Sequence, residues 1–100
     1  MKIPELPKAK PSGKTTIYMV DKVYAPQSEL RIGYVTDMSY DATGDYFKSY
    51  LMNFPLGGAF NSRINLNLRE DKGWTYGARG YFPSDDDPGP YTASAGVKAN

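Results

Sequence analysis

The chain has 100 residues, with 12 Lys and Arg against 11 Asp and Glu, so it is expected to form one small domain with a formal charge of +1. It contains no cysteine and no histidine, which excludes a cysteine zinc site, a haem ligand and a Ser-His-Asp triad. The scattered charges argue against nucleic-acid binding, and no apolar stretch approaches the roughly twenty residues that cross a bilayer.

The N-terminal part of the chain changes character after residue 14. Residues 1–14 hold three prolines and four lysines and few apolar residues, which predicts a linker. Residues 15–23 alternate and are rich in β-branched side chains, which predicts a strand. Residues 29–36 alternate again after a turn at 25–27, and predict an antiparallel partner for that first strand.

A helical period replaces the alternation between residues 41 and 73. The first apolar stripe predicts a helix with Asp41 or Asp45 as N-cap, and Pro55 is expected to end it. Gly57 and Gly58 predict a close-packed corner, and a second stripe predicts a helix that ends near residue 73. The two stripes consist of Phe47, Tyr50, Leu51 and Phe54, and of Phe60, Ile64 and Leu68.

Strand patterns return at residues 75–82 and 91–99, on either side of an acidic turn. The whole chain therefore predicts an α+β domain of order β-β-α-α-β-β, with an antiparallel or mixed sheet and helices packed on one face. The sequence ends inside its last predicted strand. We therefore expect a fragment of a longer protein, with an unpaired sheet edge that favours self-association.

Three candidate motifs carry little weight. Gly13, Lys14 and Thr15 spell the end of a phosphate-binding loop, but the leading glycine is absent and a predicted strand follows. Residues 85–87 are three aspartates, yet they lack the alternating ligand spacing of a calcium loop, and a solvated hairpin turn is the better interpretation. No pair of carboxylates is placed to act as general acid and base.

Arg69 and Tyr76 are the candidate site residues. They lie seven positions apart across the turn at Gly73, between the second predicted helix and the strand that follows. A guanidinium and a phenol together offer donors for a carbonyl, a carboxylate or an oxyanion. The alternative is structural, with Arg69 paired to Glu70 or to a helix end and Tyr76 packed at the start of a strand.

The same stretch resembles the non-catalytic domain of insulinase-type (pitrilysin) zinc metallopeptidases. The resemblance rests on Gly57-Gly58, Asn61-Ser62-Arg63, Leu68-Arg69-Glu70, Lys72-Gly73 and Thr75-Tyr76-Gly77, continues through residues 89–97, and has support upstream from residues 27–35. It covers nearly everything after the predicted linker, so we expect a truncated domain of this type at residues 15–100. Pro55 departs from the family, whose helix usually continues there with an apolar residue.

The resemblance implies a function for the parent protein. In this family two similar α+β domains close around an unfolded peptide, and the other domain holds zinc through an inverted His-x-x-Glu-His motif. This chain would then bind no cofactor and be inactive alone, with Arg69 and Tyr76 contacting substrate near the scissile bond. Its partners would be the zinc domain, on the same or a neighbouring polypeptide, and a peptide substrate. A scaffold subunit of the same family is the alternative, and a periplasmic location is implied by resemblance only.

Overall fold

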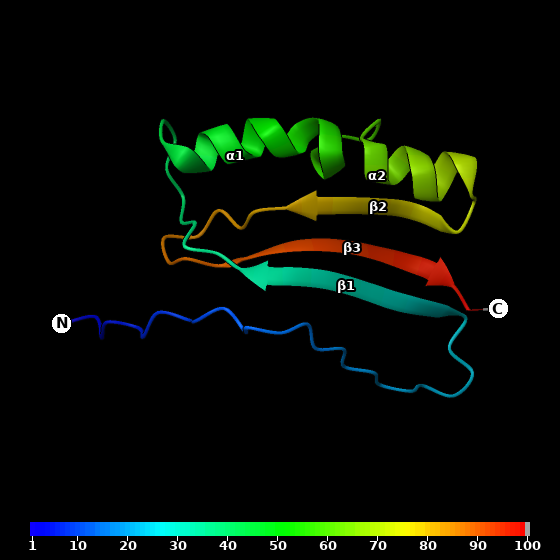
Figure 1. Ribbon diagram of the computed structural model, residues 1–100, viewed down its shortest axis with the longest axis horizontal. Helices are drawn as coiled ribbons and strands as arrows, with labels where there is room; N and C mark the ends of the chain where they lie inside the picture. Colours follow the sequence, from blue (N-terminus) through cyan, green and yellow to red (C-terminus); the bar gives the residue numbers. More distant parts are fainter. Residues whose placement is uncertain (100) are drawn as a thin grey trace.

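A computed structural model describes residues 1–99 and shows a three-stranded antiparallel sheet beside two helical segments (Figure 1). The strands are β1 (Gln27–Val35), β2 (Thr75–Tyr81) and β3 (Pro90–Lys98), and their order in the sheet is β1-β3-β2. The first helical segment is α1 (Asp45–Asn53) continued by the π-helical turn η1 (Phe54–Gly58). The second is α2 (Arg63–Asn65) continued by η2 (Leu66–Asp71). The predicted α+β class is confirmed.

The sheet has one apolar and one polar face, as the alternation predicts. β3 is the central strand, and its register places Leu30 opposite Ala95 and Tyr34 opposite Tyr91. On β2, Ala78 is also opposite Ala95, so these residues share one face. Arg31, Ser94 and Arg79 form a row across the other face.

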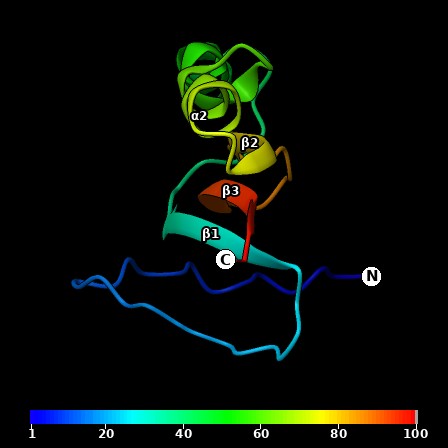
Figure 2. The ribbon, with the colours of Figure 1, turned by 90° about the vertical axis from the view of Figure 1, so that its right-hand side faces the viewer.

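The helices pack over β2 and leave most of the apolar face open. Viewed along the strands, β2 lies nearest the helices and β1 farthest from them (Figure 2). The buried apolar residues are therefore few, namely Ala78 and Ala95. Ile32, on the apolar face of β1, remains 74% exposed. No helix within residues 1–99 is long and apolar enough to span a membrane.

Pro55 does not end the first helix, which corrects the sequence prediction. Proline lacks the N–H of a regular turn and its ring crowds the carbonyl four residues earlier. The chain accommodates it by widening into the π-helical turn, in which the Ala59 N–H donates to the Phe54 carbonyl at 3.1 Å. The predicted N-cap is also wrong, because Gly44 holds that position and no side chain caps the helix. Asp41 instead accepts the Thr43 N–H at 3.0 Å.

The glycine corner packs as closely as its sequence predicts. A Cβ atom built on Gly57 would lie 2.6 Å from the Gly80 nitrogen. The backbones of η1 and β2 therefore approach so closely that only glycine, which has no side chain, fits at position 57. The second helix ends as predicted at Gly73, whose φ of +63° suits glycine. Its N–H donates to the Arg69 carbonyl at 3.1 Å. These two glycines fix where the helices meet β2.

The first predicted strand is absent, so the observed order is β-α-α-β-β rather than β-β-α-α-β-β. Residues 15–23 form no ladder and their side chains are exposed, while β1 pairs with β3 instead. The alternation alone predicted a strand, but a strand also needs a hydrogen-bonded neighbour. The division into a linker at 1–14 and a domain from residue 15 stays a prediction.

Candidate functional site

A groove lies between the helices and β2. It has a volume of about 760 Å³, is open to solvent, and is lined by α1, η1, Phe60, Asn65 and the whole length of β2 beyond Thr75. Six aromatic side chains contribute to its wall: Tyr46, Tyr50, Phe60, Tyr76, Tyr81 and Phe82. Arg79 is the charged residue among those that line it. The side chains of this wall are therefore largely aromatic.

Two buried asparagines attach the helices to the outer edge of β2. Asn53, at the end of α1, donates from Nδ2 to the Gly80 carbonyl at 2.6 Å. Asn65, at the end of α2, accepts the Ala78 N–H at Oδ1 at 2.9 Å. Both side chains are at most 4% exposed. Because backbone groups that face outward from β2 are bonded in this way, an added strand cannot pair with them at these positions.

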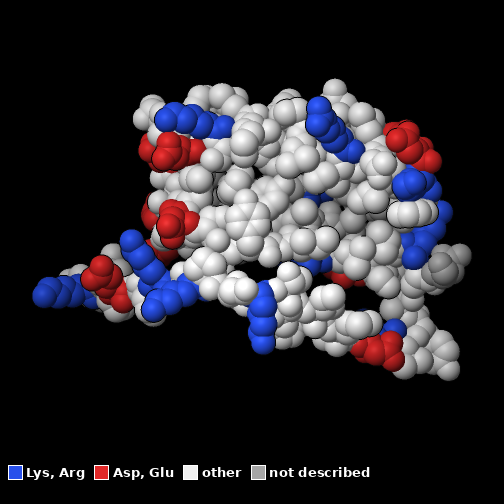
Figure 3. All heavy atoms as spheres, viewed as in Figure 1, with Lys and Arg blue, Asp and Glu red and all other residues white. Residues whose placement is uncertain are grey.

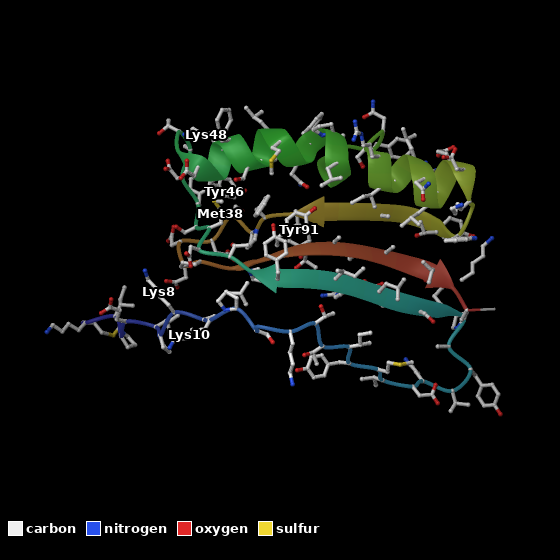
Figure 4. All side chains as sticks on the ribbon, viewed as in Figure 1. Lys8, Lys10, Met38, Tyr46, Lys48 and Tyr91 are labelled. Carbon is white, nitrogen blue, oxygen red and sulfur yellow. The ribbon has the colours of Figure 1, made fainter. Side chains whose placement is uncertain are left out.

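Asn53 also accepts a hydrogen bond from β3. The Tyr91 hydroxyl donates to Asn53 Oδ1 at 3.0 Å. Figure 4 shows the Tyr91 side chain extending from the start of β3 toward the helices. Burial raises the pKa of Tyr91 above the ordinary value of 10.0, and the nearby Tyr34 raises it further. The hydroxyl therefore remains a donor over the physiological pH range.

Arg69, in η2, lies over Phe60, which lines the groove. Its guanidinium carbon is 4.6 Å from the centre of the Phe60 ring, and Nη1 donates to Glu70 Oε1 at 2.8 Å. The Arg69 side chain is 34% exposed. The structural alternative from the sequence, a pairing with Glu70, is thus present. One carboxylate contact leaves further guanidinium donors for a ligand, because arginine carries five.

Tyr76 lies in the groove wall on β2 and is 80% exposed. Its hydroxyl has no protein partner among the hydrogen bonds of residues 1–99, so the phenol faces solvent rather than packing at the strand start. The structure contains no hydrogen bond between Tyr76 and Arg69 in that range. The two predicted site residues are therefore not joined by a hydrogen bond within residues 1–99.

Sequence reasoning missed Asn53 and Asn65. Both are polar residues within or beside an apolar helical stripe, close to the point where each α-helix changes to a π-helical turn. A polar residue in such a place is a signal for a buried hydrogen bond. The pattern does not name the partner, because Gly80 and Ala78 contribute only backbone atoms.

The acidic loop shows no metal site. Within residues 1–99 no three Asp, Glu, His or Cys side chains come together as ligands. The loop is held instead by backbone bonds, from the Tyr40 N–H to the Asp85 carbonyl at 2.8 Å and from the Gly89 N–H to the Met38 carbonyl at 3.1 Å.

Positive and negative side chains alternate around the rim of the face shown in Figure 3, whose middle is largely uncharged.

Comparison with known proteins gives a consistent result. The family model for the peptidase M16 inactive domain matches residues 2–100. A crystal structure of a peptidase M16 inactive domain from Pseudomonas fluorescens is similar in fold, with a TM-score of 0.62 and 28% sequence identity. The match covers 75% of this chain and 18% of that one, so this chain spans about a fifth of the solved relative. No curated protein matches.

Proposed function

Because this chain belongs to the peptidase M16 inactive-domain family, we propose that it forms part of the substrate-binding wall of an insulinase-type metalloendopeptidase. The supporting observation is the open aromatic groove along β2, with Tyr76 in its wall and Arg69 on Phe60 beside it. An extended peptide placed there meets apolar surface along its length and hydrogen-bond donors at one end. The substrate class that follows is a peptide or an unfolded polypeptide.

The chemical role of the chain is to bind and orient. A carbonyl oxygen near Arg69 and Tyr76 would accept from the guanidinium and the phenol, and such donors stabilise the negative charge that develops on that oxygen during peptide hydrolysis. The zinc domain would supply the metal and the water that it activates. This chain has no histidine and no cysteine to hold zinc, so by itself it is expected to be inactive.

A complementation assay tests the proposal. The chain is mixed with its candidate zinc domain and zinc, and cleavage of a quenched fluorescent peptide is followed. We expect activity in the mixture alone. Tyr76→Phe should then lower turnover at saturating peptide by about a hundredfold, the effect of removing one oxyanion donor. Tyr18→Phe is the control, because Tyr18 is also an exposed tyrosine but does not line the groove.

A second pair of variants tests the arginine. Arg69→Ala should raise KM or lower turnover, whereas Arg31→Ala should change neither, since Arg31 is also exposed and paired with a neighbouring glutamate but lies on β1.

Equal activity of the chain with Tyr76→Phe and the unaltered chain would remove Tyr76 from the chemistry. A well-folded complex that never cleaves peptide would support the alternative role as a scaffold subunit.

A further inference from the structure

We propose that Asn65 is the positioning residue that holds Arg69 and Tyr76 in their relative places. This inference rests on the proposed function of those two residues and extends it to a side chain that contacts neither of them by hydrogen bond. Asn65 belongs to α2, which continues without a break into the η2 turn that carries Arg69. It is 3% exposed, so its amide must find partners inside the protein.

The first partner of Asn65 lies on the strand of Tyr76. Asn65 Oδ1 accepts the Ala78 N–H at 2.9 Å. Ala78 follows Tyr76 by two positions in β2, and the pairing of β2 with β3 is irregular between Thr75 and Ala78, so Ala78 is the residue at which the regular ladder begins after Tyr76. The bond therefore fixes the height of α2 along β2 at the point where Tyr76 enters the groove.

The second partner of Asn65 supports Arg69. Asn65 Nδ2 donates to the Phe60 carbonyl at 2.6 Å. The Phe60 ring is the surface over which the Arg69 guanidinium lies, 4.6 Å from its centre. The Asn65 amide thus bonds the backbone of Phe60 through its nitrogen and the backbone of Ala78, on the strand of Tyr76, through its oxygen.

Only a primary amide of this length serves both partners. Aspartate keeps the acceptor for Ala78 but loses the donor to Phe60, and leucine has the shape without either group. Without that donor the Phe60 carbonyl, whose bond to Asn65 is only partly buried, either turns toward solvent or remains unsatisfied. Either result lets the Phe60 segment move relative to β2.

Asn53 provides a matched control. It is also a buried asparagine at a helix end, it also bonds the outer edge of β2, and its partner Gly80 lies two residues beyond Ala78. Its second partner is Tyr91 on β3, not the segment that carries Phe60. Replacement of Asn53 should therefore weaken the fold without moving Arg69 relative to Tyr76.

The first test uses the chain alone and needs no activity. The Phe60 ring shifts the NMR resonances of the Arg69 side chain, because the guanidinium lies over it. We expect Asn65→Asp to abolish that shift and Asn53→Asp to keep it. The two variants are compared at denaturant concentrations that lie equally far below their own unfolding midpoints. An unchanged Arg69 shift in Asn65→Asp would overturn the proposal.

The second test is a double-mutant cycle in the complemented enzyme. Asn65→Asp should lower turnover about ten- to a hundredfold, the range for a small misplacement of a binding group. Arg69→Ala should add little in that background, yet keep its full effect beside Asn53→Asp. Additive effects of Asn65→Asp and Arg69→Ala would overturn the proposal. Loss of the Arg69 shift in a chain that never supports cleavage would sustain the positioning role and reject the proposed function.

Discussion

Replacement of Gly57 by alanine tests the contact that places the first helix on β2. The added Cβ would lie 2.6 Å from the Gly80 nitrogen, 3.0 Å from its Cα and 3.3 Å from Ile64 Cδ1. The first two atoms are backbone and cannot rotate away, so helix and strand must separate. Overpacking of this kind costs about 1–3 kcal/mol, against a gain of up to about 1 kcal/mol from replacing a helical glycine. We expect a net loss of about 1–2 kcal/mol.

Gly58 supplies the matched control, since it lies in the same π-helical turn. A Cβ there would meet its nearest atom, the Asn53 carbonyl oxygen, at 3.4 Å, which is an ordinary contact. Gly58→Ala should therefore be neutral or slightly stabilising. Thermal unfolding should place Gly57→Ala about 4–16 °C below Gly58→Ala, at about 4–8 °C per kcal/mol for a domain of this size. Equal midpoints for the two variants would refute the close approach of η1 to β2.

Three further predictions concern other parts of the sheet. Asn53→Ala should lower the free energy of unfolding in urea by about 1–3 kcal/mol because the Gly80 carbonyl loses its partner, whereas Asn67→Ala, at an exposed position, should change it little. Because the pKa of Tyr91 is raised in the folded state, its neutral form stabilises the fold below pH 10.0, and this contribution is lost as pH rises through the folded pKa. Tyr91→Phe should therefore lose less stability in alkali than the unaltered chain. Identical profiles of unfolding free energy against pH for the two chains would contradict this. We also expect the chain to self-associate through β1, and Arg31→Pro to reduce the association in sedimentation experiments; a monomer at every concentration would contradict it.

The sequence was sufficient where local rules decide the structure. The alternation after residue 90 predicted both the strand and its two faces, and Ala95 on the predicted apolar side is buried. Gly73 predicted the end of the second helix because a left-handed residue there favours glycine. The pairing of Gly57 with β2 also follows from a property of the residue itself, its lack of a side chain.

The failures arose where a partner distant in sequence decides the outcome. Residues 15–23 have the composition of a strand, but β1 pairs with a strand more than 50 residues away. Pro55 predicted a helix end from the regular α-helical bond pattern, and the wider η1 turn removes that conflict. Asn65 looked unremarkable in the sequence, since its role depends on the backbone of Phe60 and Ala78.

The two edges of the sheet differ in a way that bears on partner binding. At β2 the outward-facing groups of Ala78 and Gly80 are bonded to asparagine side chains, so that edge is closed where the helices cover it. At the start of β1, the Pro26 carbonyl accepts the Ala99 N–H at 3.3 Å, and it therefore points toward β3. Because backbone groups alternate along an antiparallel strand, those of Arg31 point away from the sheet. A binding strand is thus expected at β1, whereas the proposed peptide in the groove along β2 could, at Ala78 and Gly80, be held only by side chains.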